Sequence, residues 1–153
     1  MKKLLIVSNT PAPSTQKIQQ AVAQGAQHPD ISNVQVLVKE PLVATPQDVL
    51  DAAGILIGTT ENFGYMAGLM KDFLERIYDP CLEKTEAKPY AMFVKAGQDG
   101  QGAISSMQRI IIGLRWKEIQ APLLCVGSLT DAYLQDCQDL GMSMAAGLES
   151  GIF

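Results

Sequence analysis

The sequence predicts a doubly wound α/β fold with one parallel sheet of five strands and helices on both faces. Five short apolar runs, rich in Val, Ile and Leu, are typical of buried strands; they are Leu4–Val7, Val34–Val38, Ile55–Ile57, Tyr90–Val94 and Leu123–Val126. Helical patterns lie between them. Over 153 residues this leaves roughly 30 residues for each strand–helix unit, the length that a right-handed crossover needs. We therefore expect a single domain over residues 1–153.

The helices are predicted from apolar residues that recur every three or four positions. Met66–Tyr78 has the clearest repeat, with charged residues on the opposite side. Ala103–Leu114 has the same spacing, and less regular stretches cover Thr15–Ala26, Pro46–Ala53 and Asp131–Leu148. Strands and helices therefore alternate along the whole chain.

Composition excludes several classes of protein. The chain is 47% hydrophobic and 18% charged, which is typical of a compact globular protein. Its net charge of −4 and 12 scattered basic residues argue against nucleic-acid binding. Three cysteines without a CxxC pair and a single histidine indicate neither a zinc site nor disulfides. The first apolar run stops at Ser8, too short for a signal peptide or a membrane span, so we expect a cytoplasmic protein.

Ligands of doubly wound sheets bind at the carboxyl ends of the strands, which directs attention to the loops after the first, third and fourth strands. The first loop, Ser8–Thr15, has four hydroxyl side chains and opens a helix. A helix N-terminus has unpaired N–H groups and a partial positive charge, so this loop is suited to phosphate. The alternative is that Ser14 or Thr15 only caps its own helix. The loop carries no dinucleotide or P-loop glycine motif.

The other two loops are suited to a flat polar ring. In the second loop, Gly58–Tyr65, two aromatic residues can flank such a ring and Gly64 lets the backbone approach it; alternatively, both aromatic rings pack into the core. The third loop, Gly97–Gly102, has three glycines and offers backbone donors and acceptors, unless it is an ordinary turn. A phosphate site, a ring site and polar ring contacts at one sheet edge together fit FMN.

The segment Gly58–Arg76, GTTENFGYMAGLMKDFLER, resembles the ring-binding loop and following helix of the flavodoxin-like superfamily, in particular its branch of NAD(P)H-dependent FMN reductases and WrbA-like quinone reductases. The resemblance implies strand order 2-1-3-4-5, FMN as cofactor, NAD(P)H as reductant and a small-molecule electron acceptor. It allows a homodimer or homotetramer.

The same resemblance assigns the site residues. It implies that the phosphate is held by Ser8, Thr10, Ser14 and Thr15. It implies that the ring is lined by Thr59, Thr60, Glu61, Asn62, Phe63 and Gly64, and that its polar edge meets Ala96, Gly97, Gln98, Asp99, Gly100 and Gly102. No catalytic acid or base and no metal ligand is expected, because the flavin carries the chemistry.

Two features differ from the family pattern. Flavodoxins have a Thr-Gly-x-Thr core in the phosphate loop, whereas Pro11 and Pro13 here remove two N–H donors. The third loop also lacks the aromatic residue that stacks on the ring in electron carriers. Without that aromatic residue the ring stays accessible, which favours an FMN-dependent oxidoreductase that passes electrons to a quinone or another small acceptor. A flavodoxin-like electron carrier is one alternative. A flavin-free protein of the same fold is another, and the two prolines keep it open.

Three further residue types are interpreted as structural. His28 ends the first helix before a proline. The cysteines are expected to be buried and inert, with a redox role for Cys81 as the exception. Trp116 lies far from the predicted site and is expected to act as an anchor or an oligomer contact.

Overall fold

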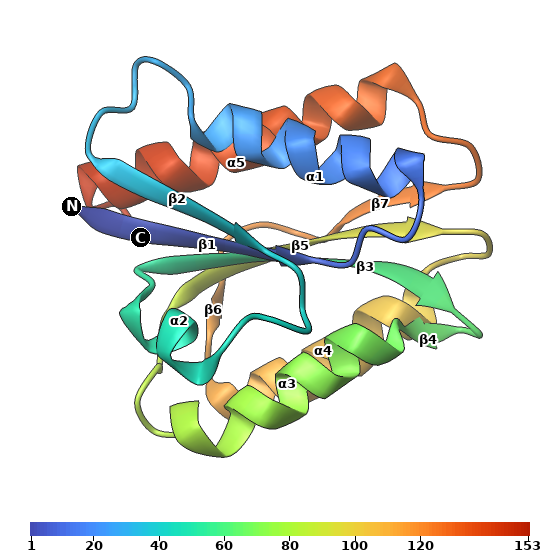
Figure 1. Ribbon diagram of the computed structural model, residues 1–153, viewed down its shortest axis with the longest axis horizontal. Helices are drawn as coiled ribbons and strands as arrows, with labels where there is room; N and C mark the ends of the chain where they lie inside the picture. Colours follow the sequence, from blue (N-terminus) through green and yellow to red (C-terminus); the bar gives the residue numbers. More distant parts are fainter.

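The computed structural model describes residues 1–153 and has three layers, with α1 and α5 on one face of a sheet and α2, α3 and α4 on the other (Figure 1). The strands are β1 (Lys2–Ser8), β2 (Val34–Lys39), β3 (Gly54–Asn62), β4 (Tyr65–Met66), β5 (Pro89–Ala96), β6 (Lys117–Glu118) and β7 (Leu123–Val126). The helices are α1 (Pro13–Ala26), α2 (Pro46–Asp51), α3 (Gly68–Cys81), α4 (Gln101–Leu114) and α5 (Asp131–Ser150).

The main sheet is parallel and runs β2-β1-β3-β5, and both β6 and β7 pair with the outer side of β5. The five predicted strands correspond to β1, β2, β3, β5 and β7. Their order is therefore the predicted 2-1-3-4-5, and the fold class is confirmed. The two-residue strands β4 and β6 were not predicted from the sequence.

The two hydrophobic cores follow from strand alternation, because successive side chains point to opposite faces of a sheet. Leu5 and Val7 pack with α2, α3 and α4, whereas Leu4 and Ile6 pack with α1 and α5. Side chains of every central strand are buried on both faces, so these strands appear in the sequence as continuous apolar runs.

The second loop is a β-hairpin, and its interpretation as a loop is wrong. The strand β3 continues to Asn62 and pairs antiparallel with β4, with Glu61 opposite Met66. Phe63 and Gly64 form the turn, with φ of 54° and 70°, as a two-residue type I′ hairpin requires. Met66 therefore belongs to β4 and not to the following helix. Met66 fits the apolar repeat of the following helix, so the sequence predicted it as helical. A buried apolar residue does not by itself distinguish a strand from a helix.

The residues interpreted as structural have structural contacts. His28 Nδ1 accepts a hydrogen bond of 3.1 Å from the Asp30 N–H. Trp116 is buried, and its Nε1 donates to Thr85 Oγ1 at 2.8 Å, as expected of an anchor. All three cysteines are free and buried. No helix combines the length and apolar content that a membrane crossing requires.

Candidate flavin site

The three predicted loops meet at one edge of the sheet, where β1, β3 and β5 end. Asn9 Nδ2 donates to Thr60 Oγ1 at 3.1 Å, and the Thr60 N–H donates to Asn9 Oδ1 at 3.3 Å, joining the first loop to β3. The Gln98 N–H donates to Glu61 Oε1 at 3.0 Å, joining β3 to the third loop. The expected convergence of the loops is therefore present, with side-chain hydrogen bonds across both junctions.

The start of α1 uses one of the predicted phosphate ligands as a cap. The helix begins at Pro13, a position where proline is favoured because its N–H would be unpaired in any case. Thr15 Oγ1 accepts from the Ala12 N–H at 3.1 Å and donates to the Ala12 carbonyl at 2.8 Å. The capping alternative therefore describes Thr15. Ser14 is half-buried and its hydroxyl makes no hydrogen bond within the chain.

The hydroxyls of Thr10 and Ser8 are linked to the carboxylate of Glu40, a residue not predicted to belong to the site. Glu40 Oε1 accepts from the Thr10 N–H at 3.3 Å and from Thr10 Oγ1 at 2.9 Å. Glu40 Oε2 accepts from Gln19 Nε2 at 3.1 Å, and this amide also donates to Ser8 Oγ at 2.8 Å. Glu40 directly follows β2, the strand beside β1, whereas the loops expected to bind the ligand were those after the first, third and fourth predicted strands.

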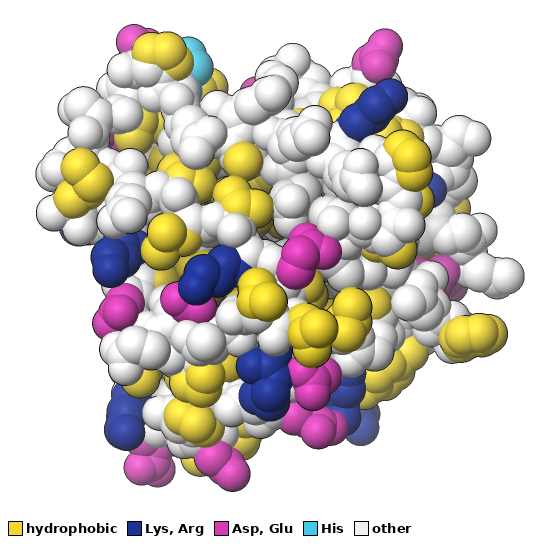
Figure 2. Space-filling model, in the orientation of Figure 1, with side chains coloured by type: hydrophobic (Ala, Val, Ile, Leu, Met, Phe, Trp, Pro, Cys, Tyr) yellow, Lys and Arg dark blue, Asp and Glu magenta, His cyan; other side chains and the backbone are white.

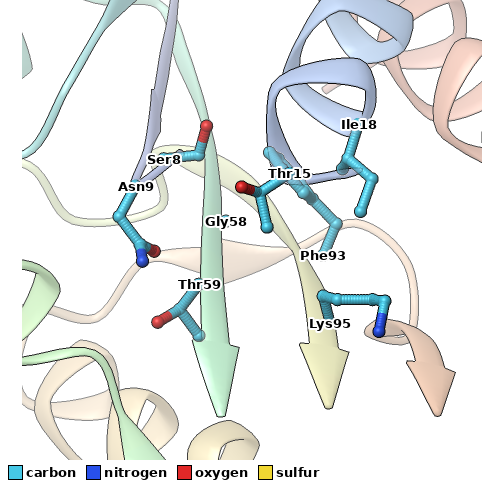
Figure 3. Close-up of a pocket in the computed structure, with 8 residues that line it drawn as sticks. All are labelled: Ser8, Asn9, Thr15, Ile18, Gly58, Thr59, Phe93 and Lys95. Atoms are coloured by element: carbon cyan, nitrogen blue, oxygen red, sulfur yellow. The ribbon is translucent and has the colours of Figure 1, made fainter. Parts of the chain in front are cut away.

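Behind the first loop the structure is closed. Figure 3 shows residues of β1, β3, β5, α1 and the first loop around a small cavity. The volume of this cavity is about 10 Å³, so it holds at most one water molecule. The Phe93 ring fills this region, since a Cβ built on Gly58 would lie 2.1 Å from Phe93 Cε2. The Lys95 ammonium, the cation of this cavity, donates to the Gly127 carbonyl. A ligand at this edge therefore lies outside the sheet, over the loops.

An open cleft lies between the hairpin and the third loop. Its volume is about 590 Å³, within the usual range for small-molecule sites. We call it the ring cleft, and it is lined by Glu61, Phe63, Gly64, Gly97, Gln98, Asp99 and Gly102. A Cβ on Gly64 or Gly97 would meet no atom within 4 Å, so both backbones are open to a planar group.

The two aromatic residues of the hairpin are not in the core. Phe63 is fully exposed and Tyr65 is 44% exposed, so the core-packing alternative is wrong for both. Figure 2 shows a hydrophobic group projecting from the molecule at the end where Figure 1 has the β3–β4 turn. Phe63 also has a left-handed backbone conformation, which is uncommon for a bulky residue.

The other predicted ring-site residues differ in their exposure to solvent. Gly97, Gln98 and Asp99 are exposed in the cleft, whereas Ala96 and Gly100 are buried behind it. Thr59 is also buried, and its hydroxyl donates to the Thr60 carbonyl at 2.9 Å and accepts from the Ala67 N–H at 2.9 Å.

Thr60 and Asn62 lie at the junction of the first loop and the hairpin, where Thr60 Oγ1 and Asn62 Oδ1 are 3.0 Å apart. Thr59, Ala96 and Gly100 therefore support the site from behind, and Thr60 and Asn62 lie beside the cleft.

Two of the three cysteines have thiols whose pKa is raised. Burial raises the pKa of Cys81 and raises the pKa of Cys137 to about 12, so both thiols stay protonated at neutral pH. Cys81 lies at the carboxyl end of α3, and its thiol contacts the Pro46 carbonyl.

Comparison with known proteins identifies the fold. No protein-family model matches the chain. An archaeal flavodoxin superposes with a TM-score of 0.79 at 20% identity, over 96% of this chain and 99% of that one. The fold is flavodoxin-like. A flavodoxin, WrbA-like protein from Agrobacterium tumefaciens superposes with a TM-score of 0.75 at 13% identity, over 97% of this chain and 98% of that one.

A relative found by sequence comparison is also named flavodoxin. The chain is 29% identical over 102 residues to the flavodoxin of Aquifex aeolicus (strain VF5), a match that covers 67% of this chain and 54% of that protein. The matched part therefore spans about half the length of this curated relative.

Proposed function

We propose that this chain is a flavin-dependent redox protein that binds the isoalloxazine ring in the ring cleft. The observation that carries the proposal is the open cleft at the carboxyl edge of a flavodoxin-like sheet, the position where ligands of doubly wound folds bind. The similarity to a protein named flavodoxin supports the same cofactor class. A bound flavin supplies both hydride and single-electron transfer.

The residues of the cleft suit a flat heteroaromatic ring. Gly64 and Gly97 leave their backbones uncovered on two sides of the cleft, where a Cβ would otherwise project. Phe63 is free to pack against one face of the ring, since it contacts no core. Glu61 and Asp99 provide acceptors for the N–H of the ring edge. The ring half of a flavin therefore fits the site.

We propose further that the chain acts as an NAD(P)H-dependent reductase that passes electrons to a quinone or another small acceptor. The cleft is wide, and the third loop contributes only Gly97, Gln98, Asp99 and Gly102 to its wall, so no second aromatic residue covers a bound ring. One ring face would stay accessible to a nicotinamide. The alternative is an electron carrier that docks to partner proteins, which the name of the Aquifex relative favours.

Flavin binding is tested by fluorescence titration of the purified protein with FMN and with riboflavin. A Gly97→Leu variant fills the cleft and should weaken binding of both by at least about tenfold. The matched control is Gly68→Leu, since Gly68 at the start of α3 also has nothing within 4 Å of a built Cβ and lies outside the cleft lining. If the protein binds neither FMN nor riboflavin, the proposal is wrong.

The reductase and carrier alternatives are separated by stopped-flow mixing of the flavin-loaded protein with NADH and with NADPH. We expect at least one of them to bleach the flavin absorbance, and benzoquinone to restore it over many turnovers. Bleaching by dithionite but by neither nicotinamide would favour the carrier.

A further inference from the structure

We propose that Glu40 is a specificity-determining residue that makes this site select the phosphate-free flavin, riboflavin, over FMN. The inference rests on the proposed flavin site and concerns the end of the ligand that lies over the first loop. It reverses the preference expected from the sequence, in which the hydroxyls of that loop hold a phosphate.

The Glu40 carboxylate already occupies the Thr10 donors, which the sequence assigned to the phosphate. Both its oxygens are bound, by the N–H and hydroxyl of Thr10 and by the amide of Gln19. Hydrogen bonds to an ionised acceptor are stronger than neutral ones, so displacing this carboxylate is unfavourable.

The position of Glu40 is fixed by the fold. The register of β1 with β2 places Val7 opposite Lys39, so Glu40 continues beside the first loop. Directly after it, the Arg76 guanidinium donates to the Pro41 carbonyl at 2.6 Å and to the Ala44 carbonyl at 2.8 Å. These contacts from α3 hold the segment after Glu40, so its backbone cannot easily swing away from a ligand.

The donors left for a phosphate are reduced. Pro11 and Pro13 have no N–H, and the Ala12 N–H is bonded to Thr15 Oγ1. Of the four hydroxyls of the first loop, only that of Ser14 has no partner within the chain. Glu40 has no ion-pair partner that would offset a second anion, because the salt bridges of the chain involve other carboxylates. A phosphate monoester carries between one and two negative charges at neutral pH, and a carboxylate beside it repels it.

Riboflavin fits the same position better. Its side chain ends in a neutral hydroxyl, which can donate to the Glu40 carboxylate, whereas the ionised phosphate of FMN supplies mainly acceptors. One carboxylate therefore attracts the neutral flavin and rejects the charged one, the combination by which many sites discriminate between related ligands.

The test is the ratio of the dissociation constants for FMN and riboflavin, measured by fluorescence titration at one salt concentration. In the unaltered protein we expect riboflavin to bind more tightly than FMN. Glu40→Gln keeps an acceptor for Thr10 and removes the charge, so it should shift the ratio toward FMN by at least about tenfold. Glu40→Ala also frees the Thr10 donors and should shift it further.

The matched control is Glu149→Gln. Glu149, near the end of α5, also accepts hydrogen bonds from another segment, from the N–H groups of Ser32 at 2.9 Å and Asn33 at 2.8 Å. Ser32 and Asn33 precede β2, whereas Glu40 follows it, so Glu149 lies at the opposite edge of the sheet. It changes the net charge equally and should leave the ratio within about twofold. If Glu40→Ala does not fold, Glu40→Gln decides.

The outcomes separate this inference from the proposed function. Tighter binding of FMN than of riboflavin, or a ratio that Glu40→Gln leaves unchanged, overturns the role of Glu40 and leaves flavin binding intact. Binding of neither flavin to any variant overturns both.

Discussion

At the first loop, Ser8, Thr10 and Thr15 all have hydrogen-bond partners within the chain, whereas in the ring cleft Phe63 and Gly97 are exposed and contact little. The first region is closed by polar contacts and the second is open. A ligand that spans both must compete with the protein itself at one end and finds free space at the other. Affinity is therefore expected from the ring, and discrimination from the first loop.

The two regions are also held by different forces. At the end of β2, the Lys39 ammonium donates to both oxygens of Asp48, and the neighbouring Glu40 holds the first loop. At the ring cleft, the hairpin turn packs directly on α4, since a Cβ on Gly102 would lie 1.7 Å from the Gly64 carbonyl oxygen. Charge changes should therefore affect the first region, and changes of shape the second.

The largest effect is expected at the contact between the hairpin and α4. Gly102→Ala should destabilise the protein by about 1–3 kcal/mol, because the added methyl group overlaps backbone that cannot easily shift. Chemical denaturation measures this change. Gly97→Ala is the control, since nothing lies within 4 Å of its built Cβ. Equal stability of the two variants would mean that the hairpin moves freely on α4.

The next effect concerns the cap in the first loop. Thr15→Ala removes the two hydrogen bonds with Ala12 and should lower the free energy of unfolding by about 1 kcal/mol. Ser14→Ala serves as the control, because the Ser14 hydroxyl has no partner within the chain. A loss of stability in Ser14→Ala equal to that in Thr15→Ala would contradict the capping role.

A change of opposite sign is expected at the hairpin turn. Phe63→Asn places a residue that tolerates positive φ where φ is 54°, so thermal unfolding should show a gain of about 0.5–1 kcal/mol. The same change removes the exposed aromatic ring and should weaken riboflavin binding several-fold, on the order of 1 kcal/mol. Tighter or unchanged riboflavin binding would show that Phe63 does not contact the flavin.

The smallest effect is a pH dependence at the end of β2. Burial of Asp48 raises its pKa, but hydrogen bonds from Lys39 and Thr45 outweigh this, and the pKa of Asp48 is lowered from 3.8. As the pH falls, Asp48 is therefore protonated in the unfolded chain before it is protonated in the folded one. The contribution of Asp48 to the free energy of unfolding is fully present above pH 3.8 and is lost as the pH falls below it.

We expect the free energy of unfolding of Asp48→Asn to fall less steeply with acid than that of the unaltered protein. The difference should be no more than about 1 kcal/mol. The control is Asp30→Asn, whose side chain is 91% exposed. If the free energy of unfolding of Asp48→Asn fell more steeply with acid than that of the unaltered protein, the lowered pKa of Asp48 would be contradicted.

Local patterns in the sequence were sufficient for the fold and for the edge of the sheet at which the three loops meet. Buried strands appear as apolar runs, and a run such as Leu123–Val126 matches β7 residue for residue. Because parallel strands end at the same edge, the meeting of the first and third loops with β3 followed from strand order alone.

Only the tertiary structure decided the contacts between segments that lie far apart in the chain. Glu40 lies 30 residues from Thr10, and no local periodicity relates them; they meet because β2 pairs with β1. The extension of β3 into a hairpin likewise depends on pairing with β4 and on the approach of Gly64 to Gly102. Burial is encoded residue by residue, whereas a hydrogen bond across the sheet exists only once the elements are packed. The proposed preference among flavins therefore depends on tertiary structure.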